Sequence, residues 1–171
     1  PRTPPHYTRM SLIIKLKIIF MGTPDFAAPA LKQLIANDYE ILAVITAPDK
    51  PVGRKQEIAP PPIKKLAIEH KIFVLQPEKL KEIKDKISDL KPDLIIVAAY
   101  GKIIPKEILD IPKYGSLNIH PSLLPKYRGP SPIQFAIFNG EKTTGATIML
   151  MDEKMDHGPI LVQKKIEIQP T

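Results

Sequence analysis

The stretch Asp93-Leu-Ile-Ile-Val-Ala98 decides the fold of this chain. Its apolar residues run on without alternation, which is typical of a strand covered on both faces in a parallel sheet. Similar apolar segments lie on both sides of it, and we expect strands at 17–21, 40–46, 72–75, 115–119, 144–151 and 159–168. The stretch therefore predicts a sheet that is buried between two layers.

Helical patterns separate most of these strands. Apolar residues at helical spacing, with prolines or polar residues at their starts, predict helices at 25–36, 60–70, 77–90 and 130–138, and a loop at 47–59. Strands that alternate with helices form parallel sheets with right-handed crossovers. The sequence thus predicts an α/β fold with a Rossmann-like, doubly wound, mostly parallel sheet. In such a sheet, ligands bind beyond the carboxyl ends of the strands.

The composition is that of a globular chain. Of its 171 residues, 43% are hydrophobic, none is Cys, and the formal net charge is +7. The lack of Cys excludes disulfides, thiolate catalysis and Cys-ligated zinc, and it fits a reducing compartment. The positive charge fits either a Lys-rich solvated surface or a polyanionic partner such as RNA. Few Asn and Gln beside 20 prolines and much Lys, Glu and Ile suggest a thermophile.

The sequence shows no membrane span and no targeting segment. The apolar patch at 12–20 is broken by Lys15 and Lys17 and falls short of the roughly 20 residues of a span. We therefore expect a cytoplasmic protein without a membrane partner. Residues 1–11 lack periodicity and are expected to be a loose N-terminal arm, which leaves 12–171 as one domain.

The segment Ser116-Leu-Asn-Ile-His-Pro-Ser-Leu-Leu-Pro125 carries the first candidate site residues. Asn118 and His120 stand two positions apart in a strand, so both side chains should leave the same face of the sheet. A lone His is more often structural, but its pairing with an amide donor just before a proline favours a functional role. We expect this pair at the carboxyl edge of the sheet.

Asp156 supplies a carboxylate in the loop that follows the strand at 144–151. We expect it at the carboxyl end of that strand, fixed by a tight turn at Gly158-Pro159. An amide, an imidazole and a carboxylate could stabilise an oxyanion and move protons at a carbonyl. An ordinary turn carboxylate is one alternative. A zinc site of His120, Asp156 and His157 is another, but no compact ligand pair is present and we expect no metal.

The turn after the first strand reads Gly22-Thr-Pro-Asp-Phe26. It has one glycine and lacks the G-x-G-x-x-G pattern of a dinucleotide site. Pro24 also removes an amide donor that could hold a pyrophosphate. NAD and FAD are therefore not expected, and the absence of a Walker A pattern leaves ATP hydrolysis unsupported.

Basic residues occur in two segments apart from Asn118, His120 and Asp156. The loop at 48–56 holds Lys50, Arg54 and Lys55, and Arg128 follows the His120 segment. These side chains fit either a solvated surface or contacts to an RNA backbone, because basic residues position phosphates. The sequence alone leaves both readings open.

Several longer stretches together resemble the 10-formyltetrahydrofolate-dependent formyltransferases. In order they are Phe20-Met-Gly-Thr-Pro-Asp-Phe26, Ala47-Pro-Asp-Lys-Pro-Val-Gly-Arg54, Val97-Ala-Ala-Tyr-Gly-Lys102, Leu117-Asn-Ile-His-Pro-Ser-Leu-Leu-Pro125, Tyr127-Arg-Gly-Pro-Ser-Pro-Ile-Gln134, Gly145-Ala-Thr-Ile-Met149 and Met151-Asp through Asp156-His-Gly158. The resemblance covers the chain from about residue 16 to its end. The second and fifth stretches look most like the branch of the family that acts on methionyl-tRNA.

The resemblance implies a formyltransferase fold and a one-carbon transfer. The formyl group of 10-formyltetrahydrofolate, a co-substrate, would pass to the α-amine of initiator methionyl-tRNA, giving formyl-methionyl-tRNA for translation initiation. In this reading Asn118 donates to the oxyanion, His120 stabilises it and exchanges protons, and Asp156 orients His120 or a water. Alternatives are a 10-formyltetrahydrofolate hydrolase, a formyltransferase for a sugar nucleotide or purine precursor, and a silent RNA- or folate-binding domain.

The resemblance also implies binding residues and a larger protein. Folate contacts are expected from Ile103, Ile104, Ser122, Leu123, Leu124, Pro125 and Asp152, and tRNA contacts from Lys50, Arg54 and Arg128. The catalytic domain at 12–171 is expected to be truncated, without the C-terminal β-barrel domain that helps to bind tRNA, and the protein is expected to be a monomer. Lys154 and His157 depart from the family pattern, which often has Gly at the first position and a small residue at the second.

Overall fold

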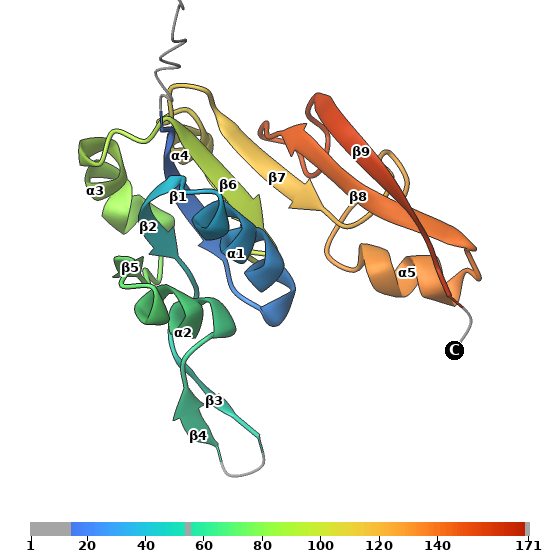
Figure 1. Cartoon of the computed structure of the whole chain (residues 1–171), viewed down its shortest axis with the longest axis horizontal. Helices are drawn as coiled ribbons and strands as arrows, with labels where there is room; N and C mark the ends of the chain where they lie inside the picture. The colour runs from blue at the N-terminus through green and yellow to red at the C-terminus, as the bar shows by residue number, and fades with distance from the viewer. Residues whose placement is uncertain (1–14, 54–55, 170–171) are drawn as a thin grey trace, which may run out of the picture.

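The computed structural model describes residues 15–53 and 56–169, in which a seven-stranded sheet forms the centre (Figure 1). The strand order is β5-β2-β1-β6-β7-β8-β9. The strands are β1 (Lys17–Gly22), β2 (Glu40–Ile45), β5 (Val74–Leu75), β6 (Leu94–Ala98), β7 (Ser116–His120), β8 (Thr143–Leu150) and β9 (Ile160–Glu167). The helices are η1 (Asp25–Ala27), α1 (Ala28–Ala36), α2 (Pro62–Glu69), η2 (Leu80–Ile83), α3 (Lys84–Asp89), α4 (Lys106–Leu109) and α5 (Pro132–Phe138).

The predicted doubly wound, mostly parallel sheet is confirmed. β5, β2, β1, β6 and β7 run parallel, whereas β8 pairs antiparallel with β7, and β9 antiparallel with β8. β1 lies between β2 and β6, so the chain winds outward from the middle of the sheet in both directions. The carboxyl ends of the parallel strands therefore share one edge, where such folds place their ligands.

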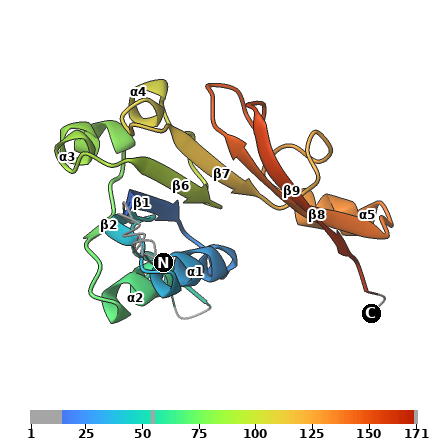
Figure 2. The same cartoon turned by 45° about the horizontal axis from the view of Figure 1, so that its top comes forward.

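Helices cover both faces of the parallel part of the sheet (Figure 2). On one face Ile95 and Val97 of β6 pack with residues of α3 and α4, including Ile87 and Ile108. On the other face α1 and α2 cover the sheet with apolar side chains that include Leu31, Ile63 and Leu66. A strand buried on both faces explains why residues 94–98 are apolar without alternation.

The loop expected at 47–59 contains a short hairpin. β3 (Lys50–Val52) and β4 (Glu57–Ala59) pair antiparallel and project from the body of the molecule (Figure 1). Strands of three residues are too short to show a periodicity in the sequence. The hairpin carries part of the basic segment, with Arg54 and Lys55 outside the described residues.

The helix expected at 77–90 is shorter than predicted. Helical structure begins at Leu80, because the Lys102 ammonium group donates hydrogen bonds to the carbonyls of Pro77 and Glu78 at 3.1 and 2.8 Å. Those carbonyls are thus taken by a side chain from a distant segment. The four-residue α4 was not predicted, since it is barely one turn long.

Two further expectations concern the N-terminal arm and the lack of a membrane-spanning segment. The N-terminal arm at 1–11 lies outside the described residues. Within the described part of the chain, the helices are too short and too polar for any of them to cross a bilayer.

Candidate active site

Asn118 and His120 leave the same face of β7, as the sequence predicts. Parallel pairing places Ser116 beside Ile95 and Asn118 beside Val97, so this face is the one that packs with α3 and α4. The Ser116 hydroxyl donates to the Leu109 carbonyl at 3.1 Å and ties the start of β7 to α4. The pair therefore stands at the carboxyl end of a strand that is fixed at its base.

Asp156 reaches this pair by a route that the sequence did not predict. We expected it at the carboxyl end of its own strand, at the same edge as His120, and this expectation is wrong. β8 runs antiparallel, with Thr147 opposite His120 and Leu150 opposite Leu117, so it ends near the start of β7. The segment 151–159 must turn back along the face of the sheet to bring Asp156 to the pair.

The close return of this loop depends on Gly158. A Cβ atom there would meet the Leu150 carbonyl oxygen at 2.0 Å, well inside any van der Waals contact. Asp156 itself has φ +47°, a left-handed conformation that Asp tolerates better than most residues. The turn expected at Gly158-Pro159 thus serves a close backbone approach.

The Asp156 carboxylate joins Asn118 and the backbone of a neighbouring turn. Oδ1 accepts a hydrogen bond from Asn118 Nδ2 at 3.2 Å, and Oδ2 accepts one from the Gly129 amide at 2.8 Å. A carboxylate only accepts, so the Asn118 nitrogen is the atom that faces it. Because that nitrogen carries two hydrogens, one of them remains for another acceptor.

His120 is held in one tautomer. Its Nε2 lies 2.8 Å from the Tyr127 carbonyl oxygen, which can only accept, so Nε2 carries a proton. Nδ1 then faces Asp156 Oδ1 at 3.6 Å, too far for a direct hydrogen bond. Nδ1 is therefore the ring atom that can gain or lose a proton at the site.

The Asn118, His120 and Asp156 side chains form a compact polar group that is largely withdrawn from water. The side chains of His120 and Asp156 are only 5% and 12% exposed. Electrostatic interactions are stronger in such surroundings than in bulk water. The arrangement can therefore donate a hydrogen bond from an amide and move a proton through an imidazole beside a fixed carboxylate.

His157 pairs with Asp152 rather than with His120. Its Nδ1 lies 2.7 Å from Asp152 Oδ2. This hydrogen bond, followed by one from the Lys154 amide, holds the pKa of Asp152 below its usual range. Among residues 15–53 and 56–169, no group of three His, Cys, Asp or Glu side chains is placed to hold a metal ion.

The residues expected at a folate site differ in their exposure. Ile103 is 84% exposed, whereas Ile104 is buried in the core beneath α3 and α4. Ser122 and Leu124 are buried and Pro125 is exposed. The Ser122 hydroxyl donates to the Lys126 carbonyl at 2.6 Å, so this side chain is already committed within the loop.

Two residues that the sequence did not single out hold the loop at 121–127. Thr147 Oγ1 donates to the Ser122 carbonyl at 2.6 Å and accepts from the Leu124 amide at 3.2 Å. Gln163 Nε2 donates to the Leu124 carbonyl at 2.8 Å and to Thr147 Oγ1 at 2.9 Å. In the sequence, the role of Thr147 and Gln163 in holding this loop is indicated only by their polar side chains within two strands.

Two of the residues expected to meet tRNA, Lys50 and Arg128, belong to different segments of the described chain. Lys50 is exposed at the start of β3, and Arg128 is exposed in the turn between Tyr127 and Gly129. Arg54 lies outside the described residues. The base of the hairpin is fixed by Asp49, which accepts hydrogen bonds from Lys64 and Gln76.

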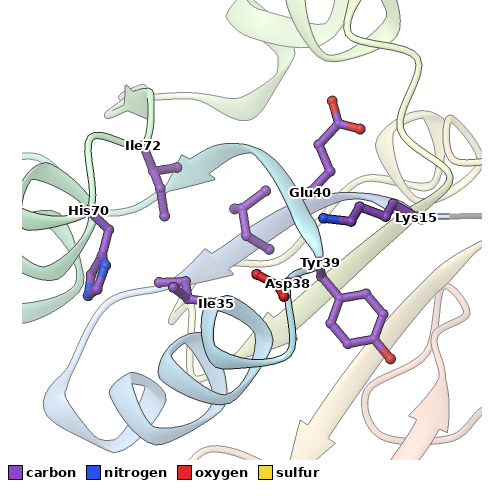
Figure 3. Close-up of a pocket in the computed structure, with 8 residues that line it drawn as sticks. Lys15, Ile35, Asp38, Tyr39, Glu40, His70 and Ile72 are labelled. Atoms are coloured by element: carbon purple, nitrogen blue, oxygen red, sulfur yellow. The ribbon is translucent and has the colours of Figure 1, made fainter. Parts of the chain in front are cut away.

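Two hollows of the described surface do not coincide with Asn118, His120 and Asp156. One, of about 350 Å³, is lined by residues that include Ile35, Tyr39 and His70 (Figure 3). It lies at the amino edge of the sheet, since Glu40 begins β2 there. A second, of about 360 Å³, is lined by Leu123, Tyr127 and Glu141 among others. We assign the site by its chemistry and its place in the fold, because Asn118, His120 and Asp156 meet at the carboxyl edge of the sheet, where ligands of such folds bind.

The doubly wound sheet and its Asn–His–Asp group place the molecule among α/β proteins whose polar site lies at the carboxyl edge. Comparison with known proteins narrows this class. The chain belongs to the formyl transferase family, whose pattern matches residues 15–171.

Two relatives that bear the same name are more than half identical to this chain over the aligned residues. The methionyl-tRNA formyltransferase of Acetivibrio thermocellus is 55% identical over 155 residues, which are 90% of this chain and 50% of the relative. That of Bacillus subtilis is 52% identical over 157 residues, with 91% and 50% covered. The chain thus spans about half the length of the curated relatives it matches.

Solved structures share the fold at lower identity. The phosphoribosylglycinamide formyltransferase of Bacillus halodurans superposes with a TM-score of 0.72 at 25% identity, covering 90% of this chain and 80% of that one. A formyltetrahydrofolate deformylase of Pseudomonas syringae gives 0.70 at 23% identity, covering 90% and 52%. The second likeness concerns the fold alone.

Proposed function

We propose that this chain is the catalytic part of an enzyme that moves a formyl group from 10-formyltetrahydrofolate to the α-amine of methionyl-tRNA. The observation that carries the proposal is the Asp156 carboxylate, which contacts Asn118 and faces His120 within a chain more than 50% identical to methionyl-tRNA formyltransferases. The product would be formyl-methionyl-tRNA for translation initiation.

The reaction begins when the neutral amine attacks the formyl carbon. The formyl oxygen then becomes an oxyanion, and the hydrogen of Asn118 Nδ2 that Asp156 does not use can be donated to it. Asp156 fixes the direction of that amide because it accepts the other hydrogen. The amide is thus oriented before substrate arrives, which is what an oxyanion donor requires.

Proton movement is assigned to the other half of the site. The attacking nitrogen must lose a proton, and N10 of the folate must gain one when its bond to the formyl carbon breaks. His120 Nδ1 is the ring atom free for this exchange, since Nε2 is engaged by the Tyr127 carbonyl. Asp156 would stabilise the protonated ring or orient a water between the two groups. These steps use side chains alone, without a metal or a nicotinamide.

Binding of the two substrates is assigned to the surroundings of the site. We propose folate contacts from the exposed Ile103, from the backbone of the loop that holds Ser122, Leu123, Leu124 and Pro125, and from Asp152, with Ile104 as packing beneath. The tRNA acceptor end would meet Lys50, Arg54 and Arg128, because basic side chains position phosphates. We further propose a monomer that works in the cytoplasm.

The test is formyl transfer by a protein that continues past Thr171, because the relatives are about twice as long as this chain. The assay supplies 10-formyltetrahydrofolate with charged tRNA, uncharged tRNA or no tRNA. Formyl-methionyl-tRNA that forms only with the charged acceptor is the expected result. Formate release in all three reactions would instead mean a hydrolase, and transfer to a sugar nucleotide or purine precursor would mean another acceptor.

A further inference from the structure

The backbone of Tyr127 has an unusual conformation at a functional position. Its φ is +56°, in the left-handed region that a bulky residue rarely enters. That conformation directs its carbonyl to His120 Nε2 at 2.8 Å. A residue in such a conformation persists only where its surroundings hold it. The hydrogen bonds of the Tyr127 side chain can supply the restraint on this backbone conformation.

The Tyr127 side chain is tied to the connection between α5 and β8. Its hydroxyl donates to Glu141 Oε1 at 2.7 Å and accepts from Asn139 Nδ2 at 3.2 Å. Lys126 Nζ also donates to Glu141 Oε1, at 3.1 Å. The hydrogen bond from Tyr127 and then that from Lys126 hold the pKa of Glu141 below its usual range, so the acceptor is a carboxylate at neutral pH.

The partners of the hydroxyl are themselves fixed. Asn139 ends α5, and the Glu141 amide donates to the Ala136 carbonyl at 3.0 Å. Ala136 is buried and packs α5 against its surroundings. The restraint on Tyr127 is thus transmitted from a helix end rather than from a free side chain.

The same turn also contacts the carboxylate of the site. Two residues after Tyr127, the Gly129 amide donates to Asp156 Oδ2 at 2.8 Å. One short segment, 127–129, therefore accepts a hydrogen bond from the imidazole and donates one to the acid. Any shift of this turn would move His120 and Asp156 relative to each other.

We infer that Tyr127 and Glu141 are positioning residues of the active site: their hydrogen bond holds the 127–129 turn, and the turn fixes the His120 tautomer and its place beside Asp156. Neither side chain is assigned a contact with substrate. The catalytic meaning of this positioning rests on the proposed function, whereas the effect on the His120 ring does not.

The first test reads the His120 ring directly in the 171-residue chain. Long-range ¹H–¹⁵N NMR spectra, with His120 assigned by a His120→Gln variant, should show the Nε2-protonated tautomer. Tyr127→Phe and Glu141→Ala should both yield mixed tautomers and faster exchange of the Nε2 proton, while Glu141→Gln, which keeps an acceptor, should retain most of the original signal. Tyr39→Phe removes a tyrosine hydroxyl at the opposite edge and should change nothing (Figure 3).

The second test uses formyl transfer by the longer protein. Loss of positioning should lower kcat about tenfold or more in Tyr127→Phe and leave both KM values within about twofold, because misplacement affects the reacting geometry rather than binding. Tyr39→Phe should match the parent.

The two tests fail in different ways. An unchanged His120 spectrum in both Tyr127→Phe and Glu141→Ala would overturn the inference, as would a rise in KM at constant kcat. A parent protein without transferase activity would instead reject the proposed function, and the ring spectra would still decide whether Tyr127 and Glu141 position His120.

Discussion

The three polar residues at the site are held by one strand, one loop and one turn. Asn118 and His120 are carried by a strand, whereas Asp156 stands on a returning loop and makes contacts to both Asn118 and Gly129. The amide depends on the acid for its orientation. The imidazole depends on a backbone carbonyl that belongs to neither element.

Removal of the amide donor gives the first prediction. Asn118→Ala should lower kcat for formyl transfer by about 10²-fold, since one lost oxyanion donor costs about 3 kcal/mol. His120→Ala and Asp156→Ala should lose more, because each removes a proton-handling group as well as a contact. Steady-state kinetics of the longer protein would measure this, with the exposed Glu153→Gln as a loop control. Near-normal turnover in either of the last two site variants would contradict the assigned roles.

Tyr100 gives a prediction about stability. Its hydroxyl is buried without a hydrogen-bond partner in the described part of the chain, and burial raises its pKa to about 12. The unfolded chain ionises this group near pH 10, so its contribution to stability is complete below pH 10 and is lost as the pH rises toward 12. Tyr100→Phe should keep or raise the melting temperature at pH 7 and reduce the loss between pH 10 and 12.

An exposed tyrosine supplies the control for that experiment. Tyr39→Phe removes the hydroxyl of a 42% exposed side chain, and it should leave the alkaline branch of the melting curve as in the parent. A Tyr100→Phe variant that melts much lower at pH 7 would contradict a hydroxyl without a hydrogen-bond partner.

The residue types at the site were predictable from sequence, but the backbone groups were not. Asn118 and His120 share a face because side chains alternate along a strand, and that alternation can be read from spacing. The Tyr127 carbonyl and the Gly129 amide carry no such signal, since every residue has these groups. Gly129 is visible in the sequence only as a possible turn residue.

At the scale of elements, the sequence predicted where strands lie better than which way they run. The apolar pattern at 144–151 is the same for a parallel and an antiparallel strand, so the reversal at β8 could not be inferred from it. The same limit applies to the helix expected at 77–90, where Lys102, distant in the sequence, donates hydrogen bonds to the carbonyls of Pro77 and Glu78. In both cases a long-range contact decided what the local pattern left open.

The anchor of the β3–β4 hairpin gives a prediction on pH. Hydrogen bonds from Gln76 and then Lys64 lower the pKa of Asp49 below its unfolded value of about 3.9. Its contribution to stability is therefore present above about pH 4 and is lost as the pH falls through the lowered pKa. Asp49→Asn should lower the melting temperature slightly at pH 7 and reduce the further fall below pH 4. Thermal melts from pH 7 to 2.5 would measure it.

The control for the anchor is an exposed aspartate elsewhere. Asp38 has φ +57°, which Asn tolerates as well as Asp does, so Asp38→Asn should keep the acid branch of the parent. An Asp49→Asn variant that loses stability with acid as steeply as the parent would show that the hairpin anchor is not the group that titrates.

At the scale of the whole molecule, one end of the sheet is much less covered than the other. Parallel strands are buried between helices, whereas β9 is exposed along its length and α5 presents apolar side chains to solvent. Cross-strand pairing puts Ile148 beside Val162 and Thr144 beside Ile166 on one face of the sheet, which is only partly buried. Several apolar side chains therefore remain exposed at this end of the sheet.

This surface predicts dye binding by the 171-residue chain. The chain should enhance the fluorescence of an apolar dye such as ANS at neutral pH, and replacing Ile137 and the 86% exposed Phe138 by Asp should reduce it. Ile58→Asp, at a 74% exposed position on the hairpin, should have less effect because that side chain stands apart from the patch. Equal loss in both variants would mean that the dye does not bind at α5 and β9.

The reversal of β8 also bears on the order in which the molecule is made. The five parallel strands are complete in a growing polypeptide once residue 120 has emerged, but Asp156 is synthesised 36 positions later and reaches Asn118 only when the segment after β8 turns back along the sheet. Domains tend to form progressively as they leave the ribosome. A nascent chain that has emerged to residue 120 would therefore carry the five parallel strands without the carboxylate of the site, and the three polar side chains could meet only after residue 156 had followed.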